Sequence, residues 1–263
     1  MLYDTHCHLN YHTDEELKGI IARAKQEILK YTMHAGSTVN EIEREIDICN
    51  KFSDEEIQIN CAVATHPENV LQDGIISPDK LSQIAKKSDK IKAIGETGLD
   101  THKAENEDFF DKQIKSFENH IETAILLNLP LIIHSRGEKA VNKVIEILQY
   151  YKNTSLQSVL HSYTGDIENA KKALDIGCNI SFSGIATFKN ANNVREIAKI
   201  VPISQMFVET DAPFLAPVPM RGKQNETSFV AHTARFLSEF LKIDFNVFCN
   251  TTTNNAKKFF RNI

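Results

Sequence analysis

Short apolar runs rich in β-branched residues alternate with longer segments of helical periodicity from one end of the chain to the other. This alternation is typical of βα units around a mostly parallel sheet. The run from Pro130 to His134 is continuously apolar up to its histidine, as expected of a strand that is buried on both faces. The predicted strands cover residues 1–5, 31–35, 58–65, 91–96, 129–134, 158–161, 179–182 and 206–211.

Between these runs, apolar residues recur every three to four positions, which predicts helices with one buried face. The predicted helices cover residues 15–29, 39–52, 79–87, 108–127, 139–151, 167–174, 194–200 and 227–241, with two short helices at 245–249 and 255–260. Eight strands with intervening helices favour a closed (β/α)₈ TIM barrel of the α/β class. An open doubly wound sheet is the alternative, but the glycine-rich dinucleotide turn is absent after the first strand.

The 263 residues, 41% of them hydrophobic, suffice for one large core. A (β/α)₈ barrel typically needs ~250 residues, and two smaller domains would need a linker. No Pro/Gly/Ser-rich stretch or short-period repeat interrupts the alternation, so we expect a single catalytic barrel domain over residues 1–263.

The five cysteines are scattered, odd in number and never in Cys-x-x-Cys spacing, which argues against a disulfide framework. No secretory leader and no membrane-spanning apolar run is evident, so we expect a cytoplasmic protein without membrane contact. The net charge of −5 argues against non-specific coating of nucleic acid. It does not exclude a phosphodiester substrate, because bound divalent cations can dominate the field of a cleft.

In barrels of this type the chemistry lies at the carboxyl ends of the strands. His6 and His8 follow the first strand one residue apart, so both rings should point to the same side, as a metal clamp requires. Cys7 should point away from them as a packed thiol. Four further candidate ligands close later apolar runs, namely Glu96, His134, His161 and Asp211.

Four imidazoles and two carboxylates suit Zn²⁺, Mn²⁺, Co²⁺ or Fe²⁺, and also Mg²⁺ if oxygen ligands dominate. Six ligands exceed the needs of one catalytic zinc, so we expect two ions, with Glu96 as the natural bridge. His6 and His8 should hold the ion shared with Glu96 and Asp211. His134 and His161 should hold the second.

Other polar residues near the strand ends are candidates for substrate contact. His66 follows the third strand, and Arg136 follows His134, where its guanidinium suits an anionic substrate or a surface ion pair. Arg221 lies on the loop after the eighth strand, within reach of a phosphate. The remaining histidines are assigned structural roles, with His120 expected to be solvated on its helix; they are His12, His34, His102, His120 and His232.

Seven short motifs stand at or just after the predicted strand ends. They are Asp4-Thr5-His6-Cys7-His8-Leu9, His66-Pro67, Gly95-Glu96-Thr97-Gly98-Leu99-Asp100, Ile133-His134-Ser135-Arg136, His161-Ser162-Tyr163-Thr164-Gly165, Glu209-Thr210-Asp211-Ala212-Pro213 and Arg221-Gly222-Lys223. In order and spacing they resemble the TatD-like metal-dependent deoxyribonucleases. The resemblance implies an amidohydrolase-type barrel, a two-metal centre and hydrolysis of DNA phosphodiesters, often from a 3′ end.

The resemblance places all six candidate ligands on the family's metal positions and His66 on that of a substrate-contacting or leaving-group histidine. Related amidohydrolases commonly bridge their metals with a carboxylated lysine, whereas this chain offers Glu96. The chain departs from the family at Thr101-His102, where an aromatic residue is common, and it lacks a second arginine and a proline after Arg221-Gly222-Lys223. These departures remove positive charge and base-stacking surface from the rim.

The expected reaction is phosphodiester hydrolysis by a water that two divalent metals activate. Asp211 would orient this water and accept its proton, while His66 and Arg136 would steady the substrate's phosphate. The expected partner is single-stranded or frayed DNA, with no obligate protein partner. Two alternatives remain open: a hydrolase of small esters, amides, lactones or aminoacyl-tRNA at the same site, and a non-catalytic metal-binding barrel.

Overall fold

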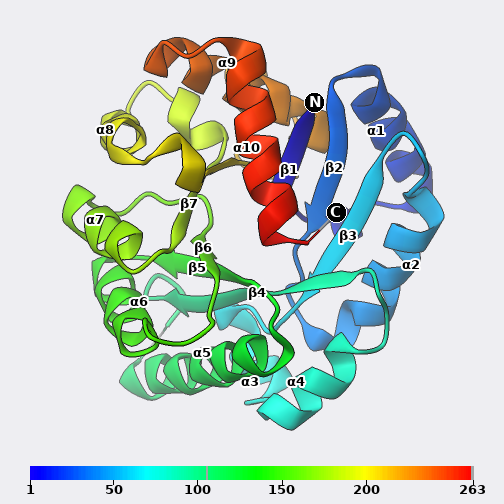
Figure 1. Ribbon diagram of the computed structural model, residues 1–263. Helices are drawn as coiled ribbons and strands as arrows, with labels where there is room; N and C mark the ends of the chain where they lie inside the picture. Colours follow the sequence, from blue (N-terminus) through cyan, green and yellow to red (C-terminus); the bar gives the residue numbers. More distant parts are fainter. Residues whose placement is uncertain (105, 262–263) are drawn as a thin grey trace.

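The eight strands of the protein form one parallel sheet in sequence order, in a computed structural model that describes residues 1–104 and 106–261. They are β1 (Leu2–Cys7), β2 (Leu29–His34), β3 (Gln58–Val63), β4 (Ile91–Asp100), β5 (Leu131–Arg136), β6 (Ser158–Leu160), β7 (Asn179–Phe182) and β8 (Met206–Val208). Figure 1 shows helices enclosing this sheet on the outside. The predicted (β/α)₈ barrel is confirmed.

Residues just after β8 close the barrel against β1. The Asp211 amide donates to the His6 carbonyl at 2.9 Å, and the His8 amide donates to the Ala212 carbonyl at 2.7 Å. Cys7 and Ala212 form an isolated parallel bridge between these two hydrogen bonds. The first and last predicted ligands are therefore held together by main-chain contacts.

Ten α-helices are present among the described residues, and most bury one apolar face against the sheet. They are α1 (Asp14–Gln26), α2 (Ile42–Phe52), α3 (Val70–Asp73), α4 (Pro78–Ala85), α5 (Glu107–Leu127), α6 (Glu138–Tyr150), α7 (Ile167–Asp175), α8 (Asn192–Ile200), α9 (Val230–Leu241) and α10 (Phe245–Phe259). None of the described helices has the length and apolar character to cross a membrane.

Six short 3₁₀ helices connect these elements in the described chain. They are η1 (Leu9–Tyr11), η2 (Val39–Glu41), η3 (Pro67–Asn69), η4 (Gly184–Thr187), η5 (Ile203–Gln205) and η6 (Thr227–Phe229). The predicted helices at 39–52 and 227–241 begin with two of them, because α2 starts at Ile42 and α9 at Val230. A first turn of 3₁₀ type is common at helix N-termini.

Helix α10 covers the end of the barrel opposite the carboxyl ends of the strands. Phe259 and Phe260 pack with Tyr3 of β1 and Phe207 of β8, and all four side chains are buried. The ring centroids of Tyr3 and Phe260 are 5.5 Å apart. In Figure 1, α10 passes in front of β1.

The prediction of two short helices at 245–249 and 255–260 is wrong, since α10 is continuous from Phe245 to Phe259. The intervening Thr and Asn residues have low helix propensity. A tertiary contact compensates, because the Thr253 hydroxyl donates to the Met1 carbonyl at 3.1 Å. The Thr252 hydroxyl, by contrast, bonds within the helix, to the Phe248 carbonyl at 3.0 Å.

Strands β4 and β5 extend past their predicted ends at Glu96 and His134, and pair as far as Asp100 and Arg136. The register shifts between Ile94 and Thr97, so Glu96 lies at an irregularity within the strand. Gly98 (φ +141°) permits the close approach of the two strands, because a Cβ there would lie 2.0 Å from the His134 carbonyl oxygen. This approach keeps Glu96 beside His134.

Strand β8 ends at Val208, before its predicted end at Asp211. Asp211 has a left-handed backbone with φ +57°, and the following Ala212–Pro213 bond is cis. Aspartate tolerates the left-handed region better than most residues with a Cβ. The turn brings Asp211 back over the barrel mouth.

His120 is fully buried, so the expectation that it is solvated is wrong. Its Nδ1 lies 2.7 Å from the Ser116 carbonyl, and its Nε2 accepts the Thr65 amide at 3.0 Å. Helix α5 packs this face against the end of β3. Burial lowers the pKa of His120 to about 4, and the neutral ring can make both hydrogen bonds.

Candidate metal centre

The carboxyl ends of five strands bring the six predicted ligands together: five of them line one cavity of about 480 Å³, and the sixth, His6, is fully buried directly behind it, in contact with Glu96. His6 lies on β1 and His8 just after it, while Glu96 and His134 lie on β4 and β5. His161 directly follows β6, and Asp211 lies on the turn after β8.

His6 and His8 point their Nε2 atoms at the same place, where these atoms are 3.2 Å apart. The Glu96 Oε2 atom lies 3.2 Å from His6 and 3.6 Å from His8. The Asp211 Oδ1 atom lies 3.6 Å from His6 and 3.4 Å from His8. Cys7 points elsewhere, and its thiol donates to the Met33 carbonyl at 3.5 Å.

The second oxygen of Glu96 faces a different pair of histidines. Its Oε1 atom lies 2.7 Å from both His134 Nδ1 and His161 Nε2. These two nitrogens are themselves 3.4 Å apart. Glu96 is only 3% exposed, so one buried carboxylate joins two groups of nitrogen donors.

The donor set fits divalent metal ions. In each group, two imidazole nitrogens face each other and also face a carboxylate. A neutral imidazole has one N–H and one lone pair, so hydrogen bonds cannot satisfy all of these atoms at once. His8 Nδ1 lies 3.2 Å from the Ala35 carbonyl, which leaves the Nε2 lone pair free for a ligand bond. Nitrogen and oxygen lone pairs that converge in this way suit Zn²⁺, Mn²⁺, Co²⁺ or Fe²⁺.

The electrostatics of the cavity keep its carboxylates ionised. Burial alone would raise the pKa of Glu96, but the imidazoles of His161, His6 and His66 bring it well below its usual value. Burial would likewise lower the pKa of His161, yet the charges of Glu96 and Glu209 raise it well above its usual value. The site therefore favours negative carboxylates before any ion binds.

Two carboxylates that the sequence reasoning did not select orient the second histidine pair. Asp100 Oδ2 lies 3.1 Å from His134 Nε2, and Glu209 Oε1 lies 3.2 Å from His161 Nδ1. Carboxylates that hold the outer nitrogen of a ligand histidine fix its tautomer and ring orientation. Glu209 stands two residues before Asp211, and Asp100 stands four residues after Glu96. This proximity to predicted ligands is the sequence feature that could have identified both carboxylates.

His66 lies beside Glu96, with its Nε2 atom 3.5 Å from Glu96 Oε1. Together with Glu96 and His134 it forms one of the three possible ligand groups found among the described residues. Its Nδ1 atom accepts the Glu68 amide at 3.3 Å, so the neutral ring carries its proton on Nε2. This assignment favours a proton donor at His66 over a metal ligand.

The two predicted substrate arginines differ in position. Arg136 lines the cavity, as does Lys103. Arg221 is exposed on the loop after β8, with its guanidinium 3.9 Å from the centre of the Phe188 ring and a hydrogen bond of 3.1 Å to the Ala216 carbonyl. Arg221 is not among the described residues that line the cavity.

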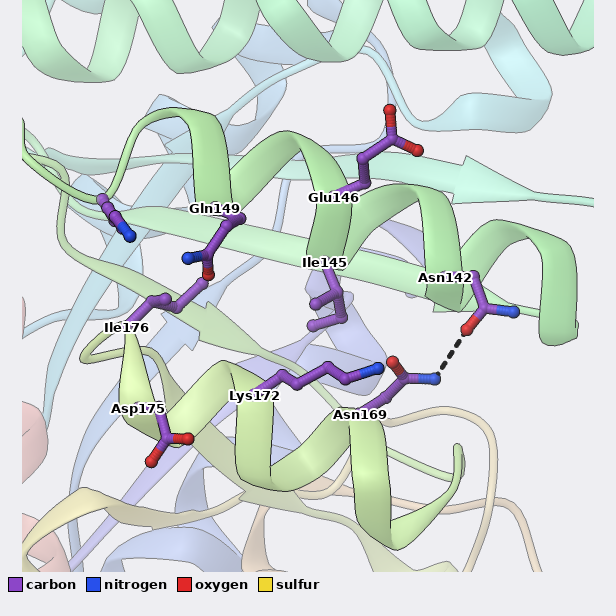
Figure 2. A pocket seen from close by; sticks show the side chains of 9 residues that line it. Asn142, Ile145, Glu146, Gln149, Asn169, Lys172, Asp175 and Ile176 are labelled. Atoms are coloured by element: carbon purple, nitrogen blue, oxygen red, sulfur yellow. Dashed lines mark hydrogen bonds between the residues drawn. The ribbon is translucent and has the colours of Figure 1, made fainter.

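A larger groove of about 680 Å³ lies on the outer ring, between α6 and α7. Figure 2 shows the hydrogen bond between Asn142 and Asn169 that crosses it. Its described lining residues include no histidine or cysteine. The chemistry-bearing residues thus gather at the barrel mouth and not in this groove.

A barrel with this donor set at the carboxyl ends of its strands defines the class of metal-dependent hydrolases. A family model described as TatD related DNase matches residues 3–261. The chain belongs to this TatD family of metal-dependent hydrolases.

Relatives of similar length extend over nearly the whole chain. An uncharacterized metal-dependent hydrolase, YabD of Bacillus subtilis (strain 168), is 34% identical and covers 99% of both chains. An uncharacterized metal-dependent hydrolase of Escherichia coli (strain K12), YcfH, is also 34% identical, over 98% of this chain and 95% of its own. The crystal structure of YjjV, a TatD homolog from Escherichia coli K12, superposes with a TM-score of 0.88 at 22% identity, over 99% of this chain and 98% of that one.

Proposed function

We propose that this hydrolase cleaves DNA phosphodiester bonds as a two-metal deoxyribonuclease, acting on single-stranded or frayed 3′ ends. The observation that carries the proposal is Glu96, whose two oxygens face two separate groups of donors. A carboxylate that bridges two ions is typical of enzymes that cleave phosphate esters. The TatD related DNase model, which matches most of the chain, supports the same reaction.

The proposed ligands divide between the two oxygens of Glu96. His6, His8 and Asp211 would hold one ion with Oε2, and His134 and His161 would hold the other with Oε1. Two bound divalent ions would supply electrostatic stabilisation of the scissile phosphate and a water of lowered pKa. Zn²⁺, Mn²⁺, Co²⁺, Fe²⁺ and Mg²⁺ are the candidates.

Asp211 would take part in the proposed proton transfer, and His66 would form a hydrogen bond to the leaving group. The Asp211 side chain is 15% exposed and faces the cavity, so it can orient the attacking water and accept its proton. The neutral His66 ring would donate a hydrogen bond from its Nε2–H to the oxygen of the leaving nucleotide and stabilise the charge that develops there, while solvent supplies the proton. Glu96, which orders both donor groups, completes the proposed catalytic set.

Arg136 is the proposed phosphate contact beside the metal centre, because its guanidinium suits a non-bridging phosphate oxygen. A substrate role for Arg221 stays a prediction. Its guanidinium stacks on the Phe188 ring, and the N–H groups at its edge would be the ones to meet a phosphate of a longer DNA strand.

The direct test is hydrolysis of a single-stranded oligonucleotide, labelled at its 5′ end so that shortening from the 3′ end is visible as a ladder. We expect cleavage with added Mn²⁺, Mg²⁺ or Zn²⁺ and none with excess chelator. Glu96→Gln and Asp211→Asn should abolish cleavage. Asparagine also tolerates a left-handed backbone, so Asp211→Asn should keep the turn and remove only the carboxylate. Glu168→Gln, an exposed carboxylate change on α7, is the matched control.

A substrate panel under the same metal condition separates the competing hydrolase functions. Turnover of esters, amides, lactones or aminoacyl-tRNA without any phosphodiester cleavage would replace the nuclease with a small-substrate hydrolase. Metal binding without turnover of any of these would indicate a non-catalytic barrel. Cleavage that resists chelation would contradict the two-metal mechanism itself.

We also propose a cytoplasmic location and action without an obligate protein partner. All five cysteines are buried and free, which suits a reducing compartment. Every proposed catalytic group lies on this one chain. Fractionation of cells that express a tagged chain tests the location, and recovery of the reduced protein with the cytosolic fraction is the expected result.

A further inference from the structure

Two aromatic side chains stand exposed beside the metal centre. Tyr11 of η1 is 55% exposed, and Phe214, on the turn after β8, is 48% exposed. Their ring centroids are 5.5 Å apart, with an angle of 78° between the rings. Both also flank His8, with centroid separations of 5.9 Å for Tyr11 and 6.3 Å for Phe214.

Buried neighbours hold these exposed rings in place. The Phe214 amide donates to the Asp211 carbonyl at 2.9 Å. The Asn225 side chain, only 1% exposed, donates both to the Phe214 carbonyl and, at 2.8 Å, to the Thr210 carbonyl. Tyr11 ends the 3₁₀ turn that Leu9, 2% exposed, anchors in the core. The backbone under each ring is thus fixed, although the ring itself faces water.

The opposite wall of the cavity carries two basic side chains beside acidic ones. Lys103 and Arg136 line it at the ends of β4 and β5, which lie across the barrel from β8 and β1 in the order of strands. Glu68 and Asp100 line the same cavity, and Glu68 pairs with Lys103 at 2.9 Å, so part of this positive charge is already compensated. The metal ligands occupy the space between the two walls. The cavity therefore has an aromatic side, an ion-binding centre and a side with an arginine and a lysine.

We infer that Tyr11 and Phe214 form a stacking subsite for the nucleobase of the nucleotide next to the scissile phosphate. The inference rests on the proposed nuclease function and adds to it the part of the substrate that each wall contacts. A nucleotide joins an aromatic base to an anionic phosphate, which matches the two kinds of wall. Stacking on exposed aromatic side chains binds any base, because every base has a π-face.

The test compares the affinities of two ligands of equal charge for the metal-loaded protein. The probes are a phosphorothioate-linked trithymidylate, which resists hydrolysis, and the same backbone with abasic sites, both measured by calorimetry. We expect the base-containing ligand to bind about tenfold more tightly to the wild type. Phe214→Leu and Tyr11→Ala should each reduce this ratio, and Tyr11→Phe should preserve it. Tyr150→Ala, a change at an 83% exposed tyrosine on α6, is the control.

The outcomes separate the subsite from the proposed function. Equal affinities for both ligands, with ratios that the variants do not change, would overturn the subsite while the nuclease assay still stands. No binding of either ligand, together with no cleavage of DNA, would overturn both. A ratio lost equally in the Tyr150→Ala control would show that the effect is unrelated to the rim, and would also overturn the subsite.

Discussion

At the scale of single residues, Asp100 and Glu209 matter because they hold the outer nitrogens of His134 and His161. We expect Asp100→Asn and Glu209→Gln each to weaken divalent metal binding by about 10–100-fold. The amide side chains keep the volume but lose the charge that orients the imidazole. Competition with a fluorescent chelator measures the dissociation constants. Unchanged affinity in both variants, beside an unchanged Glu168→Gln control, would contradict the role.

His120 should make stability depend on pH in the mildly acidic range. Its pKa falls from 6.5 in the unfolded chain to about 4 in the fold, so the unfolded chain binds more protons between these values. The protein must then lose stability as the pH falls from 6.5 towards 4. We expect this one histidine to remove about 2 kcal/mol between pH 7 and pH 5.

Denaturant unfolding of His120→Gln at both pH values isolates this effect, because glutamine does not titrate and its side-chain oxygen can accept the Thr65 amide. The loss of stability between pH 7 and pH 5 should be smaller in the variant than in the wild type. The same pH dependence in both proteins would show that His120 is not protonated on unfolding.

The sequence was most informative where a residue's role follows from its position at a strand end. The six predicted ligands were selected in this way, and the fold brings them into contact; they are His6, His8, Glu96, His134, His161 and Asp211. The sequence did not predict the contacts of four other residues, because these contacts depend on packing between distant segments; the residues are Asp100, Glu209, Tyr11 and His120. A histidine in a helical pattern carries no sign of whether its face meets water or a strand.

At the scale of elements, the apolar runs predicted where each strand occurs, but they did not predict the residue at which it ends. The extension of β4 to Asp100 depends on the close fit of Gly98 against β5, which no local pattern reveals. Likewise, α10 is continuous across residues of low helix propensity because it packs against β1 and β8. Tertiary contacts outweigh local preference in both cases.

Helix α10 should contribute strongly to stability through its last residues. Phe260 is fully buried among Tyr3, Phe207 and Phe259, and Phe260→Ala should cost about 3–5 kcal/mol of unfolding free energy. Metal binding should persist, since the ligands lie at the other end of the barrel. Denaturant unfolding together with metal analysis checks both points. Val247→Ala, at a 55% exposed position of α10, should change stability little.

At the scale of the whole molecule, metal binding should stabilise the fold. An ion that binds only the folded state adds about 2.7 kcal/mol at a free concentration one hundred times its dissociation constant. We expect the melting temperature to rise on metal addition and to return on chelation. Native mass spectrometry should find two ions per chain in the wild type and fewer in Glu96→Gln. An unchanged melting temperature with saturating metal would contradict binding at this site.

The hydrogen bonds between residues 6–8 and 211–212 close the barrel, and they also join ligands that lie about two hundred residues apart in the sequence. A nascent chain therefore cannot assemble the complete donor set until the segment after β8 has left the ribosome. Incomplete translation products that stop before Asp211 would lack both the closing contacts and one ligand. Closure of the barrel and completion of the donor set therefore depend on the same short segment, so a chain that lacks it loses both together.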